Sequence, residues 1–135
     1  MVNGRNKGAA FEREIAKMLF DELGVGFKRD IEQYRAADHG DLICDDPTFP
    51  FSLELKRYAQ GYTFRKDWWQ QCRKAAEAQG KEPALVYKYD RQPIQVVLRM
   101  AFITQDDSYD ENMLLVTDWD TFMQIVRETW NDYSI

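Results

Sequence analysis

Histidine and cysteine are scarce in this sequence. The one histidine, His39, stands in an Ala-Ala-Asp-His-Gly stretch, and the two cysteines, Cys44 and Cys72, lie far apart without a C-x-x-C spacing. A single histidine gives little support to a histidine metal cluster or a histidine-based triad, so we expect His39 to be a loop residue, with a phosphate contact as the alternative. The cysteine spacing favours two reduced thiols over a disulfide or a zinc site.

Long apolar runs are also missing. No stretch approaches the roughly 18 residues that a membrane span needs, and the first residues, MVNGRNKGAAFERE, contain no apolar segment of a secretory signal. We therefore expect a cytoplasmic protein without a membrane partner. The 135 residues suit one domain, and a hydrophobic content of 44% is enough for a sizeable core.

The net charge of −5 taken alone argues against a nucleic-acid partner. The charge is unevenly distributed, however. Residues 101–135 hold eight acidic residues and one basic residue, and subtracting these from the totals of 23 and 18 leaves 15 acidic and 17 basic residues in residues 1–100. The sequence therefore predicts a mildly basic body, followed from about residue 101 to residue 135 by an acidic C-terminal extension.

Apolar periodicity predicts an α/β (α+β) fold in which helices flank a mixed sheet. Glycines 24 and 80 end the first two predicted helices, and Thr117 caps the last one, which carries its apolar residues on one face. The predicted helices cover residues 5–23, 66–79 and the stretch after residue 117. The predicted strands or extended segments cover residues 25–35, 41–44, 51–58, 84–89 and 94–103, with a polar loop at 104–112.

Two of these predicted strands carry charges that a half-buried strand does not need. Asp41 opens the first, and Glu54 and Lys56 lie within the second. If residues 45–50 form the loop of a hairpin with symmetric register, Asp41 faces Glu54 across the two strands. Lys56 lies two residues beyond Glu54 and points to the same face. The hypothesis is that the three side chains converge, although a one-residue slip would move Asp41 to the other face.

Two opposed carboxylates repel each other, and a divalent cation removes that repulsion. Mg²⁺ typically takes one or two carboxylates together with waters and phosphate oxygens, and a nearby lysine can orient a water or a phosphate. The alternative left open is a surface salt bridge of Lys56 with Glu54 or Asp41 on a solvated face.

An Asp, a loop and a Glu-x-Lys strand in this order resemble the PD-(D/E)xK nuclease superfamily. The segment K-G-A-A-F-E-R-E at residues 7–14 resembles the opening helix of the archaeal-type Holliday junction resolvases, and of phage resolvases built on that plan. Further matching pieces follow in the same order, namely Arg29, Gly40-Asp41, Glu54-Leu55-Lys56 and the P-A-L-V-Y-K strand at residues 83–88. The resemblance covers roughly residues 5–98 and implies a restriction-endonuclease-like fold.

The resemblance also implies an activity, namely metal-dependent cleavage of four-way DNA junctions by a homodimer, with Mg²⁺ or Mn²⁺ as cofactor. Asp41 and Glu54 would ligate the metal, joined by the backbone carbonyl of Leu55 and by Glu12, directly or through water. Lys56 would handle the attacking water or the scissile phosphate. The residues expected to contact DNA phosphates are Lys7, Arg13, Lys17, Arg29 and Arg35.

The second predicted helix adds one further candidate. In several branches of the superfamily a glutamine on this helix reaches the metal site, and Gln71 is the one we select here, with a solvated glutamine as the alternative. The neighbouring Trp68 and Trp69 are expected in the core or a dimer interface rather than as a platform for bases.

Simpler interpretations stay open at this point. Glu12 is also compatible with a solvated helix position. Arg13 and Lys17 are also compatible with a routine surface ion pair that involves the nearby Glu14. Two other functions compete with junction resolution: a PD-(D/E)xK nuclease of restriction-like, repair or single-strand specificity, and a catalytically silent DNA- or protein-binding module. The acidic C-terminal extension could bind a partner or mimic DNA, or its apolar helix face could belong to the core.

Overall fold

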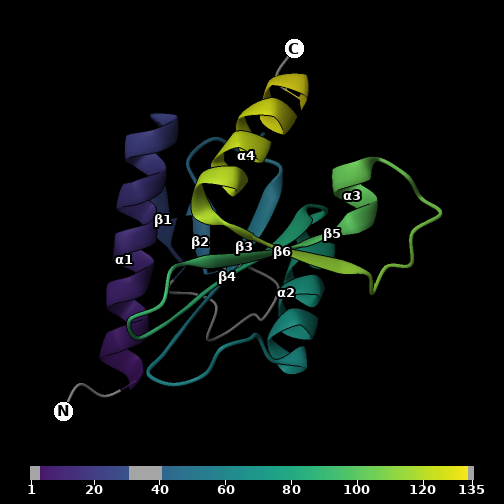
Figure 1. Ribbon diagram of the computed structural model, residues 1–135. Helices are drawn as coiled ribbons and strands as arrows, with labels where there is room; N and C mark the ends of the chain where they lie inside the picture. The colour runs from purple at the N-terminus through teal and green to yellow at the C-terminus, as the bar shows by residue number, and fades with distance from the viewer. Residues whose placement is uncertain (1–3, 31–40, 134–135) are drawn as a thin grey trace.

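The computed structural model describes residues 4–30 and 41–133 (Figure 1). Its helices are α1 (Gly4–Leu23), α2 (Lys66–Gln79), α3 (Met100–Thr104) and α4 (Trp119–Tyr133). Its strands are β1 (Phe27–Arg29), β2 (Leu42–Cys44), β3 (Phe51–Tyr58), β4 (Glu82–Tyr89), β5 (Gln95–Arg99) and β6 (Leu114–Asp118). None of the helices in these ranges is long and apolar enough to span a membrane.

The strands of the described ranges form one mixed sheet in the chain order β1-β2-β3-β4-β5-β6. β3 and β4 run parallel, and every other neighbouring pair is antiparallel. A parallel pair needs a long crossover connection, which α2 provides. The predicted mixed sheet with flanking helices is therefore confirmed.

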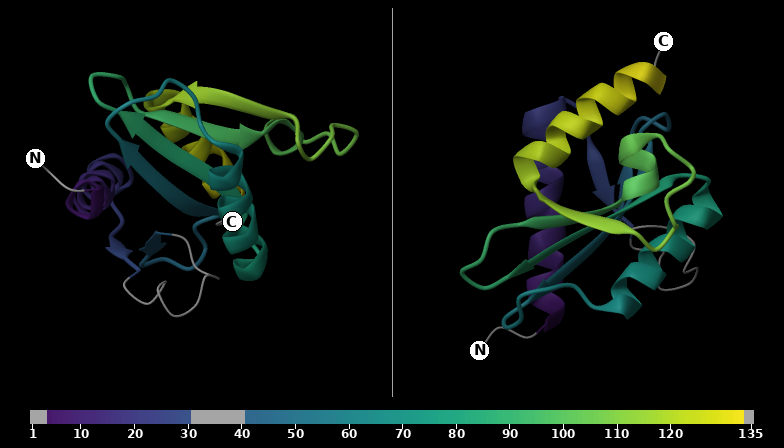
Figure 2. Two further views of the ribbon diagram at one scale, coloured as in Figure 1. Left: turned by 90° about the horizontal axis from the view of Figure 1, so that it is seen from below. Right: turned by 45° about the vertical axis from the view of Figure 1, so that its right-hand side comes forward.

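Helices cover both faces of this sheet, as the two views in Figure 2 show. On one face α2 packs through Trp68, Trp69 and Cys72, which confirms that both tryptophans belong to the core. The opposite face carries α1 and α4. The buried residues of that larger core include Phe11, Ile15 and Leu19 of α1, Phe51, Leu53 and Leu55 of β3, and Phe122, Met123 and Val126 of α4.

The ends of the first two long helices lie where the sequence predicts them. Gly24 has a φ of +72°, a conformation that favours glycine, and its N–H donates to the carbonyl of Phe20 over 2.8 Å. Gly80 ends α2 in the same way with a φ of +66°. Both glycines supply the left-handed residue that commonly closes a helix.

The β2–β3 hairpin has the predicted register. Leu42 pairs with Leu53, and the N–H of Asp41 donates to the carbonyl of Leu53 over 2.8 Å. In an antiparallel pair this register sets Asp41 opposite Glu54. β1 adds a third antiparallel strand on the other side of β2.

The C-terminal third departs from the prediction. The strand predicted over residues 94–103 is too long, because β5 ends at Arg99 and Met100 begins the short helix α3. Gln105, with a φ of +55°, ends that helix. Continuous apolar sequence does not distinguish a buried strand from a short buried helix, which accounts for the error.

The strand β6 was not predicted, and the predicted cap of the last helix is wrong. Thr117 lies inside β6, where it pairs with Val96. The residue that caps α4 is Asp118, whose carboxylate accepts the N–H of Thr121 over 2.7 Å. The helix follows the strand without any intervening glycine or proline, so the sequence contains no signal for a boundary between them.

The acidic C-terminal segment is built into the fold. β6 extends the sheet beside β5, and α4 buries Phe122, Met123 and Val126 in the larger core. Its acidic side chains lie mainly on the exposed loop before β6 and on the outer face of α4. The alternative that this segment contributes core residues is the one that the structure supports.

Candidate active site

The polar face of β3 carries the predicted site. Alternation along the strand sends Phe51, Leu53 and Leu55 into the larger core and the residues between them toward α2. The contacts with α2 follow the strand in order. These pairs are Gln79 with Ser52, Gln71 with Lys56, and Trp68 with Tyr58.

Asp41 and Glu54 lie together in the interior, with only 6% and 2% of their surfaces exposed. The Glu54 carboxyl donates a hydrogen bond to Asp41, so the pair shares one proton. Burial, followed by the neighbouring Asp41 charge, raises the pKa of Glu54 to about 9. Burial also raises the pKa of Asp41, although the N–H of Leu55 partly opposes this effect. The predicted convergence of the two carboxyl groups is therefore observed.

The backbone of Leu55 completes this arrangement at the start of β2. Its N–H donates to Asp41 Oδ2 over 2.6 Å. The N–H and C=O groups of alternate strand residues point to the same edge. The carbonyl of Leu55 is thus directed to the edge where the Leu53 carbonyl accepts the Asp41 N–H. This orientation suits the prediction that the Leu55 carbonyl is a metal ligand.

Lys56 joins the carboxyl groups to α2. Its Nζ lies 3.8 Å from Glu54 Oε2 and donates to Gln71 Oε1 over 3.0 Å. Gln71 is thus the glutamine of α2 that faces the site, as selected from the sequence. The salt bridge of Lys56 with Glu54 that the alternative expected is present, but it lies on a buried face and not on a solvated one.

Glu12 of α1 approaches from the other side, but it has a partner of its own. Arg29 Nε donates to Glu12 Oε2 over 2.6 Å, and Glu12 also raises the pKa of Asp41 through its charge. Within residues 4–30 and 41–133, no three His, Cys, Asp or Glu side chains are close enough to hold a metal ion together. A direct metal bond from Glu12 therefore stays a prediction, beside the alternative of a water between them.

The remaining basic residues predicted to contact DNA have varied surroundings. Lys7 pairs with Asp90 over 3.2 Å, and Lys17 pairs with Asp21 one helical turn away over 2.8 Å. Arg13 is exposed on α1. Arg35, like His39, lies outside the described residues. Their roles in DNA binding stay predictions.

Sequence reasoning missed Arg57, which joins the same network as Lys7. Its guanidinium lies 2.6 Å from Asp90 Oδ1, so one carboxylate ties the start of α1 and the end of β3 to the turn after β4. Strand alternation could have shown that Arg57, as the neighbour of Lys56, faces away from the site. The sequence could not show that its partner is Asp90, because that residue lies 33 positions further along the chain.

The donor set fits a hard divalent cation. Two carboxyl groups and a backbone carbonyl supply the oxygen ligands that Mg²⁺ and Mn²⁺ prefer, and Mg²⁺ commonly uses only one or two carboxylates. The proton shared by Asp41 and Glu54 marks where a positive charge is favoured. A cation would replace that proton and remove the repulsion between the ionised groups.

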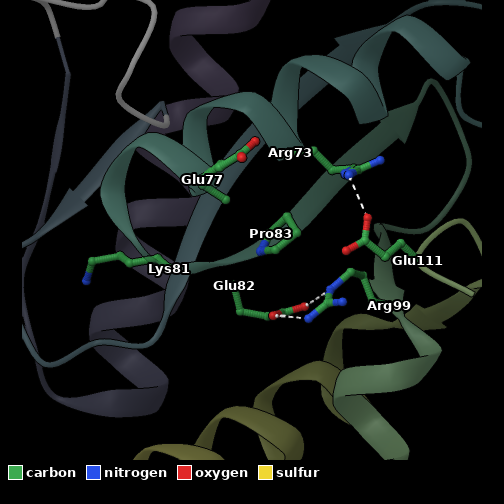
Figure 3. A pocket seen from close by; sticks show the side chains of 8 residues that line it. Arg73, Glu77, Lys81, Glu82, Pro83, Arg99 and Glu111 are labelled. Atoms are coloured by element: carbon green, nitrogen blue, oxygen red, sulfur yellow. Dashed lines mark hydrogen bonds and ion pairs between the residues drawn. The ribbon is translucent and has the colours of Figure 1, made fainter. Parts of the chain in front are cut away.

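A charged hollow lies beside α2 and does not belong to this site. Its volume is about 300 Å³, and Figure 3 shows the side chains that line it. Arg73 is paired with Glu111 over 3.1 Å, and Arg99 makes two hydrogen bonds to Glu82. Each guanidinium already has a carboxylate partner. Neither guanidinium of this hollow therefore offers a free positive charge to an anion.

Nearly the whole chain matches a family model. Residues 3–132 match the family described as "Phage putative PDDEXK endonuclease". The match includes the C-terminal segment, beyond the part that resembles the resolvases by its motifs. None of the curated proteins matches the chain.

The fold is also similar to a solved structure. Hjc from Archaeoglobus fulgidus, a Holliday junction resolvase from an archaeal hyperthermophile, superposes with a TM-score of 0.54 over 90% of this chain and 98% of that chain. The two sequences are 14% identical, so this likeness concerns the fold. The family match carries the assignment: the chain belongs to the phage PDDEXK endonuclease family.

Proposed function

We propose that this endonuclease resolves four-way DNA junctions by metal-dependent hydrolysis of phosphodiester bonds. The observation that carries the proposal is the buried Asp41–Glu54 pair with Lys56 beside it. The proposed junction substrate is supported by the fold that the chain shares with the Archaeoglobus resolvase. Residues 1–135 act as one nuclease domain in this proposal.

Mg²⁺, or Mn²⁺, would be held by Asp41 and Glu54, with the Leu55 carbonyl and Glu12 as further ligands. Such an ion supplies an activated water and stabilises the negative charge that develops on the phosphate oxygens. The chain's own contribution is to hold the two carboxyl groups in a buried, fixed position. Asp41 is oriented by the Leu55 N–H, which limits the rearrangement of its side chain before the reaction.

Lys56 supplies a fixed positive charge next to the carboxyl groups. Gln71 accepts a hydrogen bond from its ammonium group and thereby directs it toward the face shared with Glu54. In that place Lys56 orients the attacking water or stabilises a phosphate oxygen in the transition state. Gln71 is a positioning residue in this scheme, because it acts through Lys56.

DNA would bind through phosphate contacts from the basic residues around the site. Lys7 and Arg29 already lie beside carboxylates of the protein, and Arg13 is exposed beside Glu12 on α1. The proposed contacts are Lys7, Arg13, Lys17, Arg29 and Arg35. Since such contacts release counterions, the affinity for junctions should fall steeply as salt is raised.

Two opposed strands must be cut to resolve a junction, which a symmetric homodimer can do with two copies of the site. Light scattering should therefore give twice the 16.0 kDa mass of the chain at micromolar concentration. A monomer under these conditions would contradict the dimer. The proposed location is the cytoplasm of the cell in which the phage replicates.

The decisive experiment is cleavage of a labelled four-way junction beside a linear duplex with the same arms. Wild type and Glu54→Gln are compared in Mg²⁺ and in EDTA, with Glu77→Gln, an exposed acidic residue of α2, as the matched control. Paired symmetric nicks in the junction alone, lost in EDTA and in Glu54→Gln, are expected. Equal cutting of the duplex would keep the site but replace the substrate. No cutting by folded wild type would favour the silent binding module.

A further inference from the structure

The loop between β3 and α2 leaves the sheet just after the site. Tyr58 lies two residues after Lys56 and faces the same side of β3, about 7 Å further along the strand. From Lys56 to Lys66 the chain has four basic residues and no acidic one. Three aromatic residues are interspersed among them, namely Tyr58, Tyr62 and Phe64.

Hydrogen bonds fix this loop to the turn after β4. Tyr89 Oη donates to the carbonyl of Thr63 over 2.6 Å, and Gln92 Nε2 donates to the carbonyl of Gly61 over 2.7 Å. The N–H of Asp90 donates to the carbonyl of Ala59 over 3.3 Å. Both segments lie near the beginning of α1 in Figures 1 and 2. The loop therefore has a defined conformation beside the site.

Gly61 allows the loop to lie against the Tyr89 ring. Its φ is +147°, and a Cβ at this position would come within 2.4 Å of the ring. Any other residue would push the loop outward or strain its backbone. This close packing at Gly61 adds to the hydrogen bonds that hold the neighbouring Tyr62 in place.

Two aromatic side chains are presented to solvent from this fixed segment. Tyr62 is 85% exposed, more than any other large hydrophobic side chain in the described ranges. Tyr58 is 44% exposed, and its ring is stacked on Trp68 with centroids 5.1 Å apart. Isolated exposed aromatic residues are ordinary. Aromatic rings on a fixed segment beside a phosphodiester site are typical of surfaces on which bases stack.

We propose that Tyr62 stacks on an unpaired base of the DNA strand whose phosphate occupies the site. The inference rests on the proposed nuclease function and narrows its substrate to DNA with bases outside the duplex stack. In intact duplex both faces of each base are covered by neighbours, and exposing one costs a few kcal/mol. Branch points and single strands offer such bases already, and DNA rises only about 3.4 Å per nucleotide, so the loop lies within a few nucleotides of the cut.

The test measures binding in Ca²⁺, without Mg²⁺ or Mn²⁺, to a four-way junction, a single strand and a duplex of matched sequence. Each DNA carries 2-aminopurine close to the expected cut. Tyr62→Ala removes the ring and Tyr62→Phe keeps it. Met113→Ala, which trims another exposed apolar side chain in the loop before β6, is the matched control.

Tyr62→Ala should weaken binding to DNA with unpaired bases about tenfold or more and abolish the 2-aminopurine quenching. Binding to the duplex should change less than about twofold. Tyr62→Phe and Met113→Ala should behave as wild type, and all variants should melt as wild type because Tyr62 is exposed. If Tyr62→Ala loses affinity for the junction alone, the branch point supplies the base. If it loses affinity for the single strand as well, any unpaired base can be bound.

Unchanged affinity of Tyr62→Ala for all three DNAs would overturn the stacking contact. An equal loss on the duplex would overturn it too, because the tyrosine would then be a non-selective contact. Cleavage by wild type in Mg²⁺ is scored separately. If wild type does not cleave DNA but its binding depends on Tyr62, the proposed nuclease function is overturned and the stacking contact stands.

Discussion

Asp41 and Glu54 hold one proton between two buried carboxyl groups. Such a pair is unfavourable in the metal-free chain, because burial penalises each charge and each charge opposes the other. The two carboxyl groups therefore favour the binding of a cation, and they lower the free energy of unfolding of the metal-free chain. Two residue-level predictions follow from this conflict.

The first concerns the pH dependence of stability in EDTA. The pKa of Glu54 is raised from its ordinary 4.5 to about 9, so between these values the folded chain keeps a proton that the unfolded chain has released. The free energy of unfolding should then fall with rising pH, by up to about 1.4 kcal/mol per unit. Urea unfolding from pH 5 to 8.5 should show a shallower slope for Glu54→Gln. Parallel slopes of variant and wild type would contradict the shared proton.

The second concerns metal. At pH 7.5 Mg²⁺ or Mn²⁺ should raise the melting temperature, since a ligand at a hundred times its Kd stabilises the folded state by about 2.7 kcal/mol. Asp41→Asn and Glu54→Gln should each lose this shift, whereas Glu77→Gln should keep it. A metal shift that survives in both site variants would place the ion elsewhere.

Residue types and alternation were enough to predict that the central side chains of the candidate site converge. Asp41, Glu54 and Lys56 share a face because strand alternation and a symmetric hairpin leave few other arrangements. The pairing of Glu12 with Arg29 was beyond reach, because it depends on how α1 packs against β1. The Asp90 network with Lys7 and Arg57 was missed because it depends on how α1 and β3 meet the turn after β4.

At the scale of elements, glycine was the most informative residue. Gly24 and Gly80 end α1 and α2 where the sequence predicts, because their left-handed backbone is a local property. β6 was missed because its identity depends on its neighbour in the sheet, and α3 because it continues the apolar run of β5. Leu114–Asp118 becomes a strand by pairing with β5, a contact that no local pattern announces.

The corrected start of α4 can be tested by substitution. Asp118→Ala removes the acceptor of the Thr121 N–H and should lower the melting temperature by a few degrees. Thr117→Val removes only the hydroxyl of the residue first predicted as the cap and keeps a strand-forming side chain. A calorimetric scan in which Thr117→Val is the more damaging change would restore the original assignment.

For the whole molecule, the acidic C-terminal segment is expected to be essential to stability. Phe122 is completely buried on α4, so Phe122→Ala should reduce the free energy of unfolding by about 3–5 kcal/mol. Phe20→Ala removes a ring that is 57% exposed on α1 and should change it by less than about 0.5 kcal/mol. Similar denaturant midpoints for the two variants would mean that α4 is dispensable.

The sharing of one core by α1 and α4 has a consequence for the newly made chain. Every proposed catalytic residue, from Glu12 to Gln71, leaves the ribosome before Phe122, Met123 and Val126 do. Long-range contacts of this kind delay folding until the last partner is present. We therefore expect the nascent chain to be harmless to DNA until α4 has been made and can complete the core.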